Sequence, residues 1–269
     1  MSEEKVIFIG PDGLEYCQKC KTARELHLPN KIMGEDFKVH VMCACQRAEY
    51  EKAEQVRKER EFNEMVSTNK SICFHEPRMK EWNFDNDDGS VPAMERAKQF
   101  VESWDEVVRA HAGLLLWGGV GTGKTYMAAC IANALLEQGK RVYMTDFAAI
   151  SNISVFDAEE YVRSLAAYDL LIIDDLGAER DSEFAIQNVF NVINRRWESG
   201  KPLVVTTNLT LDEIKQQKNI SMERIYDRIL DMCTFVKVDG PSKRLESAER
   251  KKSLFSRIFG VKGAVNGRE

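Results

Sequence analysis

The sequence predicts an α/β protein whose main domain is a three-layer parallel sheet, preceded by a small cysteine-bearing module and a connecting helix. Three observations predict this architecture. From Ala93 onward, short apolar runs alternate with helical patterns; a glycine-rich loop joins one such run to a helix; and four of the seven cysteines fall within the first 45 residues. Strands that are apolar on both faces are typical of a parallel sheet covered by helices on both sides.

Composition sets outer limits on the function. Of the 269 residues, 43% are hydrophobic and 30% are charged, and the formal net charge is −5. This charge excludes a protein that coats nucleic acid through overall positive charge, so any such contact must come from a local basic patch. The acidic N-terminus is no secretory signal, and the longest aliphatic runs are too short to span a bilayer. We therefore expect a cytoplasmic protein with no membrane partner.

The N-terminal module is expected to span residues 1–66 and to bind a metal. It contains two close pairs of cysteines, namely Cys17 with Cys20 and Cys43 with Cys45. In a reducing compartment, two such pairs on two turns can hold a tetrahedral Zn²⁺, which would supply stability that the few large apolar residues cannot. His27 and His40 are substitute ligands to consider, and four free thiols are the alternative to a metal site.

A charged helix is expected to connect this module to the rest of the chain. The stretch Gln46–Val66 contains no Gly or Pro and carries five Lys/Arg against six Glu, which predicts an exposed helix with many short-range ion pairs. It is either a solvated connection or a helix that binds a partner. Residues 67–92 follow as a linker, because Pro77, Pro92 and an Asn-Asp-Asp-Gly stretch between them indicate loops.

The main domain is expected over residues 93–245, followed by a basic tail over 246–269. Helices are predicted at about 93–110, 123–138, 157–166 and 183–198, and strands at about 113–117, 141–145, 169–174, 202–206 and 234–238. From Pro241 to its end the chain carries eight Lys/Arg and three Glu. The remaining cysteines are isolated along the chain and are expected to be packing residues: Cys73, Cys130 and Cys233.

The glycine-rich loop carries the candidate nucleotide site. Its residues fit Gly-x4-Gly-Lys-Thr between a predicted strand and a predicted helix: Gly118, Gly119, Val120, Gly121, Thr122, Gly123, Lys124 and Thr125. The glycines let successive backbone N–H groups converge on a phosphate, and the helix N-terminus adds partial positive charge. Lys124 can then reach the β- and γ-phosphates of ATP, and the Thr125 hydroxyl can ligate Mg²⁺.

Two acids and an amide follow the next strands. Asp174 ends an apolar strand and is expected to hold Mg²⁺ beside Thr125, while Asp175 is placed to orient and activate the attacking water. Asp175 is one methylene shorter than the Glu of many ATPases of this layout, and the alternative is that it caps the following turn. Asn208 ends the next strand, where its amide can position the water between the metal and the γ-phosphate.

Three arginines are candidates for contacts with the γ-phosphate. Arg224 and Arg228 are four residues apart, which places them on one helical face. Either can act as an arginine finger on a neighbouring subunit's γ-phosphate, or it can form a pair within its own helix, as with Asp227. Arg244 follows the strand over 234–238 and can sense the γ-phosphate within the same chain.

Five motifs occur in a characteristic order along the chain: Gly-Gly-x-Gly-x-Gly-Lys-Thr, Leu-Leu-Ile-Ile-Asp-Asp-Leu-Gly-Ala-Glu, Thr-Thr-Asn, Arg-Ile-x-Asp-Arg and Gly-Pro-Ser-x-Arg. Over roughly residues 95–245 this order resembles the AAA+ replicative helicase loaders of the DnaC/DnaI type. Phage versions and the related IstB transposition helpers are similar. The resemblance implies that Asn208 is the sensor 1 residue and Arg244 the sensor 2 residue. It also implies Arg228 as the arginine finger, since its spacing to Arg244 favours it over Arg224.

The resemblance also implies a function. Loaders of this type are ATPases that place the replicative DNA helicase on single-stranded DNA, and their subunits associate so that one subunit's arginine completes the next one's ATP site. DnaI-like members carry a zinc-bearing N-terminal domain that grips the helicase. Lys140, Arg141 and Arg163 are conceivable DNA contacts. The alternatives are an IstB-like transposition helper and a metabolic P-loop kinase, which would need an acceptor site and no arginine from a neighbour.

Overall fold

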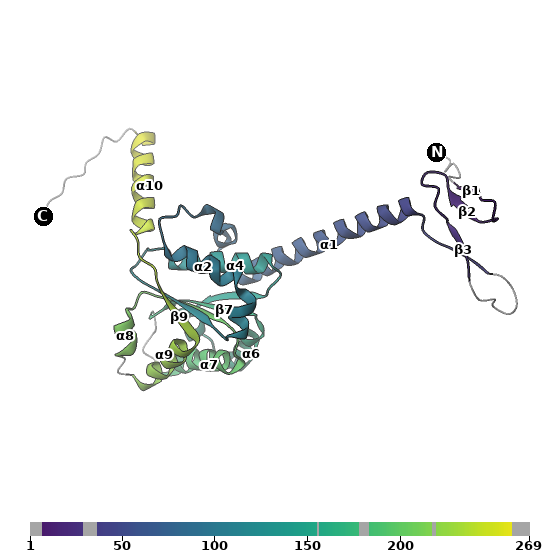
Figure 1. The fold of residues 1–269 in the computed structure, drawn as a ribbon. Coiled ribbons are helices and arrows are strands. Elements are labelled where there is room, and N and C mark those ends of the chain that lie inside the picture. The colour runs from purple at the N-terminus through teal and green to yellow at the C-terminus, as the bar shows by residue number, and fades with distance from the viewer. Residues whose placement is uncertain (1–6, 29–36, 155, 178–182, 217–218, 260–269) are drawn as a thin grey trace. The chain divides into compact units, whose positions relative to one another are not determined.

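The structure, a computed structural model, describes residues 7–28, 37–154, 156–177, 183–216 and 219–259 (Figure 1). The chain divides into two compact units, Met1–Glu64 and Met65–Glu269. Parts of the predicted features lie outside the described residues. These are residues 1–6 and 29–36 of the expected N-terminal module, the Ala-Glu pair that follows Gly177, and the basic tail from 260 onward.

The N-terminal unit is built from two short antiparallel hairpins and the start of a long helix. Strands β1 (Ile7–Ile9) and β2 (Glu15–Cys17) form one hairpin, and β3 (Glu25–His27) and β4 (Lys38–His40) form the other. Among the described residues of this unit, the buried apolar side chains are those of Leu14, Cys17 and Cys43. Two of these three are cysteines, so the described part of the unit lacks the large apolar core that usually stabilises a domain.

Helix α1 (Ala44–Cys73) confirms the predicted connecting helix but extends seven residues beyond the predicted end. The residues after Val66 contain neither Gly nor Pro, so nothing in the local sequence stops the helix until Pro77 approaches. Of its 30 residues, all of them described, Cys73 alone is buried. Ion pairs such as Arg60 with Glu64, at 2.8 Å, lie along its exposed surface, as the charge pattern predicted.

The remainder of the predicted linker is ordered against the main domain. It contains two short 3₁₀ helices, η1 (Pro77–Glu81) and η2 (Phe84–Asn86). The buried Asn133 amide on helix α4 (Lys124–Glu137) donates to the carbonyls of Met79 and Trp82, both at 2.8 Å. The Tyr126 hydroxyl, also on α4, donates to the Asn83 carbonyl at 2.9 Å. These contacts fix the segment to the helix that begins at Lys124.

The main domain is a five-stranded, fully parallel sheet with the order β6-β7-β8-β5-β9. The strands are β5 (Gly113–Trp117), β6 (Val142–Asp146), β7 (Leu170–Leu176), β8 (Leu203–Thr207) and β9 (Cys233–Lys237). Every strand predicted for this domain is present: β5 has the predicted bounds, and the ends of the other strands differ by one or two residues. The apolar runs therefore identified the sheet correctly.

Helices cover both faces of this sheet. The helices of the domain are α2 (Ala93–Glu102), α3 (Trp104–Arg109), α4, α5 (Phe147–Ser151), α6 (Ala158–Ala167), α7 (Glu183–Ser199), α8 (Leu211–Lys215), α9 (Ile220–Met232) and α10 (Lys243–Phe259). Of these, α10 projects away from the sheet (Figure 1). Leu114 and Leu116 on β5 pack in the apolar cluster that includes α2 and α4. Leu115, on the opposite face of the same strand, packs in the cluster that includes α7 and α9. The predicted three-layer α/β architecture is confirmed.

Two other sequence expectations can be compared with the structure. The helix predicted over 93–110 is divided at Ser103 into α2 and α3, because the Ser103 backbone leaves the helical conformation. The isolated cysteines Cys73, Cys130 and Cys233 are all buried, as expected of packing residues. Among the described residues, no helix is both long and apolar enough to cross a bilayer.

Arg196 on α7 stabilises the amino ends of two strands. It is 1% exposed, and its guanidinium donates to the carbonyls of Tyr168, Asp169 and Pro202 at 2.8, 2.7 and 3.0 Å. Burial lowers the pKa of Arg196 to about 10, so the side chain is still a cation at neutral pH. These three carbonyls precede β7 and β8, and Arg196 is the side chain that satisfies them.

Replacing this buried cation is expected to destabilise the domain. Arg196→Met leaves three buried or partly buried carbonyls without this donor, so we expect the free energy of unfolding to fall by about 3 kcal/mol. Urea denaturation followed by circular dichroism measures this change. The matched control is Arg195→Met, whose side chain is 59% exposed and should change stability by less than about 0.5 kcal/mol. Equal losses in the two variants would contradict the role given to Arg196.

Candidate functional site

The loop between β5 and α4 has the backbone geometry that phosphate binding requires. Gly118 and Gly121 have φ angles of 151° and 82°, which residues with a side chain rarely adopt. A Cβ atom would lie 2.3 Å from the Val238 carbonyl oxygen at Gly118, and 2.2 Å from the Ser242 hydroxyl at Gly121. The Lys243 N–H donates to the Gly121 carbonyl at 3.0 Å. The loop is therefore held tightly against the segment that leads into α10.

Lys124 lies at the centre of the site. Its Nζ donates to the carbonyls of Gly118 and Gly119 at 2.9 and 2.7 Å, and to Oδ1 of Asn208 at 2.7 Å. Burial lowers the pKa of Lys124, while the nearby carboxylates Asp175 and Asp174 oppose that shift. The Lys124 side chain therefore lies inside the loop, where the phosphates of a nucleotide would lie.

Asp174 and Thr125 form a pair suited to a hard cation. The Thr125 hydroxyl donates to both carboxylate oxygens of Asp174, at 3.1 and 3.0 Å, and the Thr206 hydroxyl also donates to Asp174. Burial raises the pKa of Asp174, and these hydrogen bonds oppose the shift. Neighbouring ligands of an octahedral Mg²⁺ with bonds of about 2.05 Å are about 2.9 Å apart. The Thr125 hydroxyl oxygen and a carboxylate oxygen of Asp174 are therefore at the right separation for two adjacent ligands of Mg²⁺.

Asp175 is held in a strained backbone conformation. Its φ is 55°, and the pairing of β7 with β8 shifts register between Ile173 and Leu176. A non-glycine residue in this region is uncommon, and such bulges often redirect side chains at functional sites. The Asp175 N–H donates to the Thr206 hydroxyl at 3.0 Å, and its carboxylate accepts from the Asn208 amide at 3.5 Å. Asn208 thus contacts both Lys124 and Asp175.

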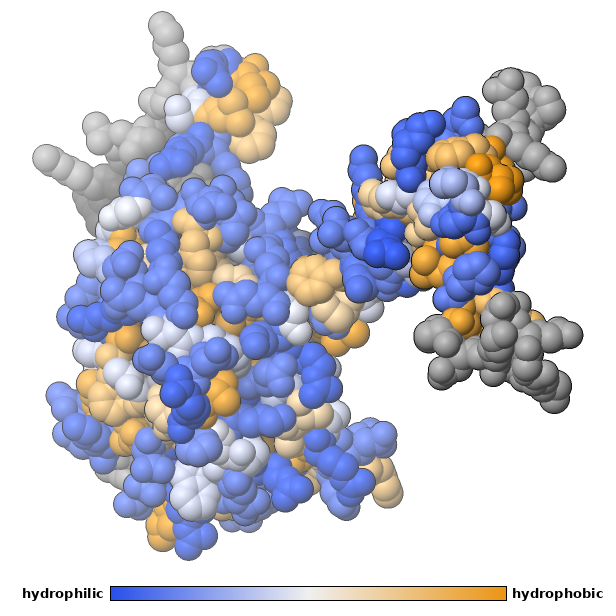
Figure 2. All heavy atoms as spheres, turned by 45° about the vertical axis from the view of Figure 1, so that its right-hand side comes forward, coloured by the Kyte–Doolittle hydropathy of each residue, from blue (hydrophilic) through white to orange (hydrophobic). Residues whose placement is uncertain are grey.

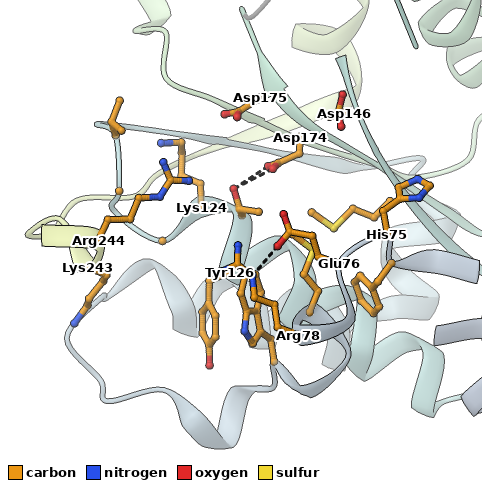
Figure 3. Close-up of a pocket in the computed structure, with 18 of the residues that line it drawn as sticks. His75, Glu76, Arg78, Lys124, Tyr126, Asp146, Asp174, Asp175, Lys243 and Arg244 are labelled. Atoms are coloured by element: carbon orange, nitrogen blue, oxygen red, sulfur yellow. Dashed lines mark hydrogen bonds and ion pairs between the residues drawn. The ribbon is translucent and has the colours of Figure 1, made fainter. Parts of the chain in front are cut away.

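A cavity of about 860 Å³ opens over these groups (Figure 3). It is lined by most of the predicted site residues, namely Val120, Gly121, Gly123, Lys124, Thr125, Asp174, Asp175, Asn208 and Arg244. The other loop residues lie behind it: Gly118 and Gly119 hold the lysine, and the Thr122 hydroxyl donates to the Gly119 carbonyl at 3.0 Å. The structure therefore brings residues from β7, the end of β8, the loop with the start of α4, and the start of α10 to one site.

Arg224 and Arg228 lie elsewhere, on α9, and neither lines this cavity. The Arg228 Nε donates to Asn194 at 2.8 Å, and its guanidinium lies 4.9 Å from the ring centre of Phe190 and 5.6 Å from that of Trp197. Arg224 is exposed. Within its own chain Arg228 is therefore engaged by α7, whereas Arg224 projects into solvent. The assignment of an arginine finger stays a prediction.

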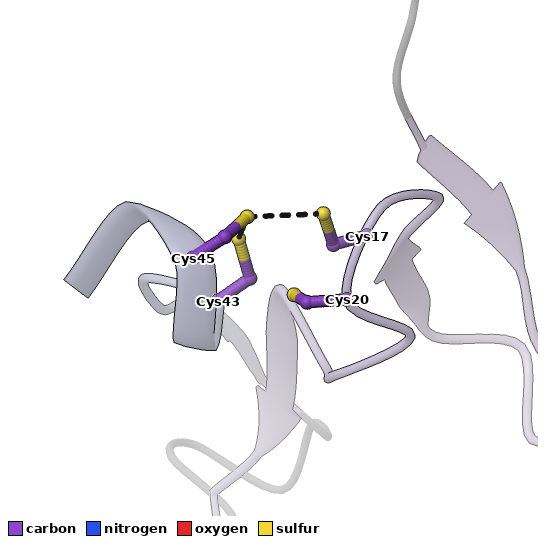
Figure 4. A group of neighbouring side chains, drawn as sticks. All are labelled: Cys17, Cys20, Cys43 and Cys45. Carbon is purple, nitrogen blue, oxygen red and sulfur yellow. Dashed lines mark hydrogen bonds between the residues drawn. The ribbon is translucent and has the colours of Figure 1, made fainter. Parts of the chain in front are cut away.

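The four N-terminal cysteines form one cluster (Figure 4). Their Sγ atoms all lie within 4.8 Å of one another, with 3.6 Å between Cys17 and Cys45 and 3.3 Å between Cys43 and Cys45. Sulfurs at the corners of a tetrahedron with Zn–S bonds of about 2.3 Å are about 3.8 Å apart. The cluster is compatible with zinc. Neither candidate histidine belongs to it; His40 instead lies 3.9 Å from the carboxylate of Glu25.

Sequence reasoning missed several groups at the nucleotide site. Thr206, which contacts both acids, was considered only as part of Thr-Thr-Asn; pairing of β8 with β7 is the signal that would have placed it there. The wall formed by the segment after α1, including Glu76 and Arg78, was assigned to the linker. No spacing rule relates that segment to the loop, because the contact depends on tertiary packing.

The parallel sheet, the glycine-rich loop after β5 and the acid Asp174 near the end of β7 define a P-loop nucleotide-binding protein. The chain belongs to the IstB-like ATP-binding protein family, whose family model matches residues 48–252. This confirms the resemblance to the DnaC/DnaI-type and IstB-related proteins noted in the sequence.

Two curated relatives are similar over about half of the chain. The replicative helicase loader DnaC of Escherichia coli K12 is 30% identical over 149 residues, which cover 53% of this chain and 58% of DnaC. The replicative helicase loader DnaI of Bacillus subtilis 168 is 27% identical over 174 residues, which cover 59% of this chain and 56% of DnaI. The chain thus matches little more than half the length of these relatives.

Solved structures show the same fold. A crystal structure of DnaI has a TM-score of 0.54 at 23% identity and covers 65% of this chain and 98% of that one. A crystal structure of the DnaC helicase loader has a TM-score of 0.51 at 22% identity, covering 61% of this chain and 100% of that one. At these identities, the comparison establishes the fold.

Proposed function

We propose that this protein is an ATP-dependent loader that places a hexameric replicative DNA helicase on single-stranded DNA, with ATP hydrolysis to ADP and phosphate acting as the assembly switch. The observation that carries the proposal is the cavity in which Lys124, Thr125, Asp174 and Asn208 converge. The names of the relatives DnaC and DnaI, both replicative helicase loaders, support the cellular role.

Each residue of the site has a distinct task in this proposal. Lys124 exchanges its internal acceptors for the β- and γ-phosphate oxygens of ATP. Thr125 and Asp174 hold Mg²⁺, which when bound would neutralise phosphate charge. Asp175 and the Asn208 amide together orient the attacking water, since the structure already places the two side chains in contact.

Two arginine tasks complete the ATP site in this proposal. Arg244 lies at the cavity wall and contacts the γ-phosphate within the chain. Subunits then associate through their ATP sites, and α9 of one subunit supplies an arginine to the next. Arg228 has the spacing of the DnaC/DnaI-type finger, and Arg224 has the exposed side chain. If Arg224 is the finger, the contacts of Arg228 with α7 would hold α9 in position. If Arg228 is the finger, its contacts with Asn194, Phe190 and Trp197 would have to break before it could reach the neighbouring subunit.

The N-terminal unit is the proposed grip on the helicase, with Zn²⁺ bound by its cysteine cluster. Although it is small, this unit exposes several apolar side chains: Ile9, Leu26, Leu28, Phe37 and Met42. Figure 2 shows apolar surface on this unit. An exposed apolar patch on a small unit is typical of a protein-binding surface. Single-stranded DNA would contact basic side chains of the ATPase domain, for which Lys140, Arg141 and Arg163 are candidates.

Capture by purified helicase tests the proposal. We expect immobilised hexameric replicative helicase of the same host to retain the full chain, and Mg-ATP to promote helicase transfer to circular single-stranded DNA while Mg-ADP does not. The family match also supports an IstB-like transposition helper as a second candidate. Absence of capture with every nucleotide, together with ATP-dependent assembly on duplex DNA, would contradict the loader role and favour the second candidate.

A further inference from the structure

The cavity over the phosphate-binding loop has a second end that the phosphate chemistry does not use. Its phosphate end is formed by the loop, Asp174, Asp175 and Asn208. One of its other walls is formed by the segment Cys73–Trp82, and another by the start of α10 with Lys243 and Arg244 (Figure 3). A nucleotide whose phosphates lie in the loop must place its sugar and base elsewhere in the same cavity, and the segment Cys73–Trp82 is one surface that can contact them.

Four carboxylates line this cavity, and three of them accept hydrogen bonds from residues of the strand ends or of the phosphate-binding site. Asp174 accepts from Thr125, and Asp175 from Asn208. Asp146 accepts from the Ala149 N–H at 2.6 Å and so begins α5. These three side chains belong to the strand ends and the phosphate site. The fourth, which comes from the segment after α1, belongs to neither.

That fourth carboxylate is Glu76, which is paired with Arg78. The Arg78 Nε donates to Glu76 Oε2 at 2.6 Å, and the two side chains are 72% and 50% exposed. An ion pair in contact with solvent contributes little to stability, so a ligand group can replace one partner at small cost. The Arg78 guanidinium also lies 5.8 Å from the ring centre of Trp82 and would keep this contact if Glu76 turned toward a ligand.

The position of Glu76 relative to the loop is fixed by packing. Glu76 immediately precedes η1, and the Asn133 amide bonds the carbonyls of Met79 and Trp82 at 2.8 Å. Asn133 is 1% exposed and lies on α4, the helix that begins with Lys124. One helix therefore holds both the phosphate-binding lysine and the wall that carries Glu76, so the separation between them is set by the fold.

We propose that Glu76 recognises the ribose of the bound nucleotide by accepting hydrogen bonds from its 2′- and 3′-hydroxyls. This inference rests on the proposed function, because it takes the triphosphate to lie in the loop. A carboxylate accepts from two adjacent hydroxyls well, and hydrogen bonds to a charged acceptor are the stronger kind. The site then distinguishes ribonucleotides from deoxyribonucleotides, and ATP binds more tightly than dATP.

Isothermal titration of the full chain with Mg-ATP and Mg-dATP tests the inference. We expect dATP to bind at least about tenfold more weakly than ATP to the parent protein, because it lacks one hydrogen bond to a charged group. In Glu76→Ala the two nucleotides should bind with equal affinity, since ATP loses what dATP already lacks. The matched control is Glu81→Ala at the end of η1, an exposed residue outside the cavity, which should keep the preference for ATP.

The outcomes separate this inference from the function on which it rests. Equal affinity of the parent protein for ATP and dATP would overturn ribose recognition alone, and so would a preference that survives in Glu76→Ala. Failure of the parent protein to bind either nucleotide would overturn the proposed function and the inference together. Thermal unfolding of each variant checks the fold, and Glu76→Gln, which retains an oxygen acceptor, should keep part of the preference if the fold is intact.

Discussion

Lys124→Ala is expected to abolish ATP binding, with a loss of affinity of at least about 100-fold. The side chain supplies the cation that the loop directs at the β- and γ-phosphates, and charge-assisted contacts of this kind are among the strongest in a nucleotide site. Lys124 is 5% exposed, and its ammonium is held by Gly118, Gly119 and Asn208, so water cannot replace it easily. Isothermal titration with Mg-ATP measures the loss.

Two controls show whether Lys124→Ala loses ATP affinity because a phosphate contact is missing or because the protein is unfolded. Lys215→Ala removes an exposed lysine at the end of α8 and should leave ATP affinity unchanged. The zinc content of Lys124→Ala should equal that of the parent protein, because the cysteine cluster belongs to the other compact unit. ATP affinity within about threefold of the parent value in Lys124→Ala would refute the site, since a loss of one strong contact exceeds that factor.

Removal of zinc is expected to unfold the N-terminal unit and to abolish helicase capture. Structural zinc sites contribute about 10–16 kcal/mol of binding free energy near neutral pH, far more than a small unit with a few buried apolar residues can gain by packing. We expect metal analysis to find one zinc ion per chain. Chelation, or Cys17→Ser, should make residues before α1 sensitive to limited proteolysis while ATP binding persists.

The matched control for the metal site is Cys130→Ala. This residue is buried on α4, outside the cluster, so its replacement should leave the zinc content unchanged. Purified protein without zinc would contradict the metal site. If the helicase still captures the protein after complete chelation, it must bind another surface, and the cysteine cluster then has a purely structural role.

The sequence predicted the sheet well because its strands are apolar on both faces. Leu114 to Leu116 and Leu170 to Ile173 are buried runs of strand length, which is the pattern typical of strands in a parallel sheet. The loop residues were predicted for a related reason, since Lys124 and Thr125 act through positions that are local to one turn. The Thr125–Asp174 contact agrees with the expectation that they share a metal.

What the sequence did not predict depends on tertiary contacts. The segment from Cys73 to Trp82 has the composition of a linker, yet Asn133 holds it against α4. The engagement of Arg228 by α7 likewise has no local signature, because Asn194 and Trp197 are more than 30 residues away along the chain. Helical spacing alone placed Arg224 and Arg228 on the same face and could not distinguish the bound side chain from the exposed one.

The hydrogen bonds that Lys124 makes within the protein should also weaken the binding of simple anions at the site. The ammonium already donates to two backbone carbonyls and one amide oxygen. An anion that binds to Lys124 must replace these three acceptors, and a single favourable contact is not enough to do so. A lone sulfate or orthophosphate competes against all three acceptors at once. A chain of linked phosphates engages the loop amides first and presents its further oxygens to the lysine at high local concentration. We therefore expect the site to bind a nucleoside triphosphate in preference to simple inorganic anions.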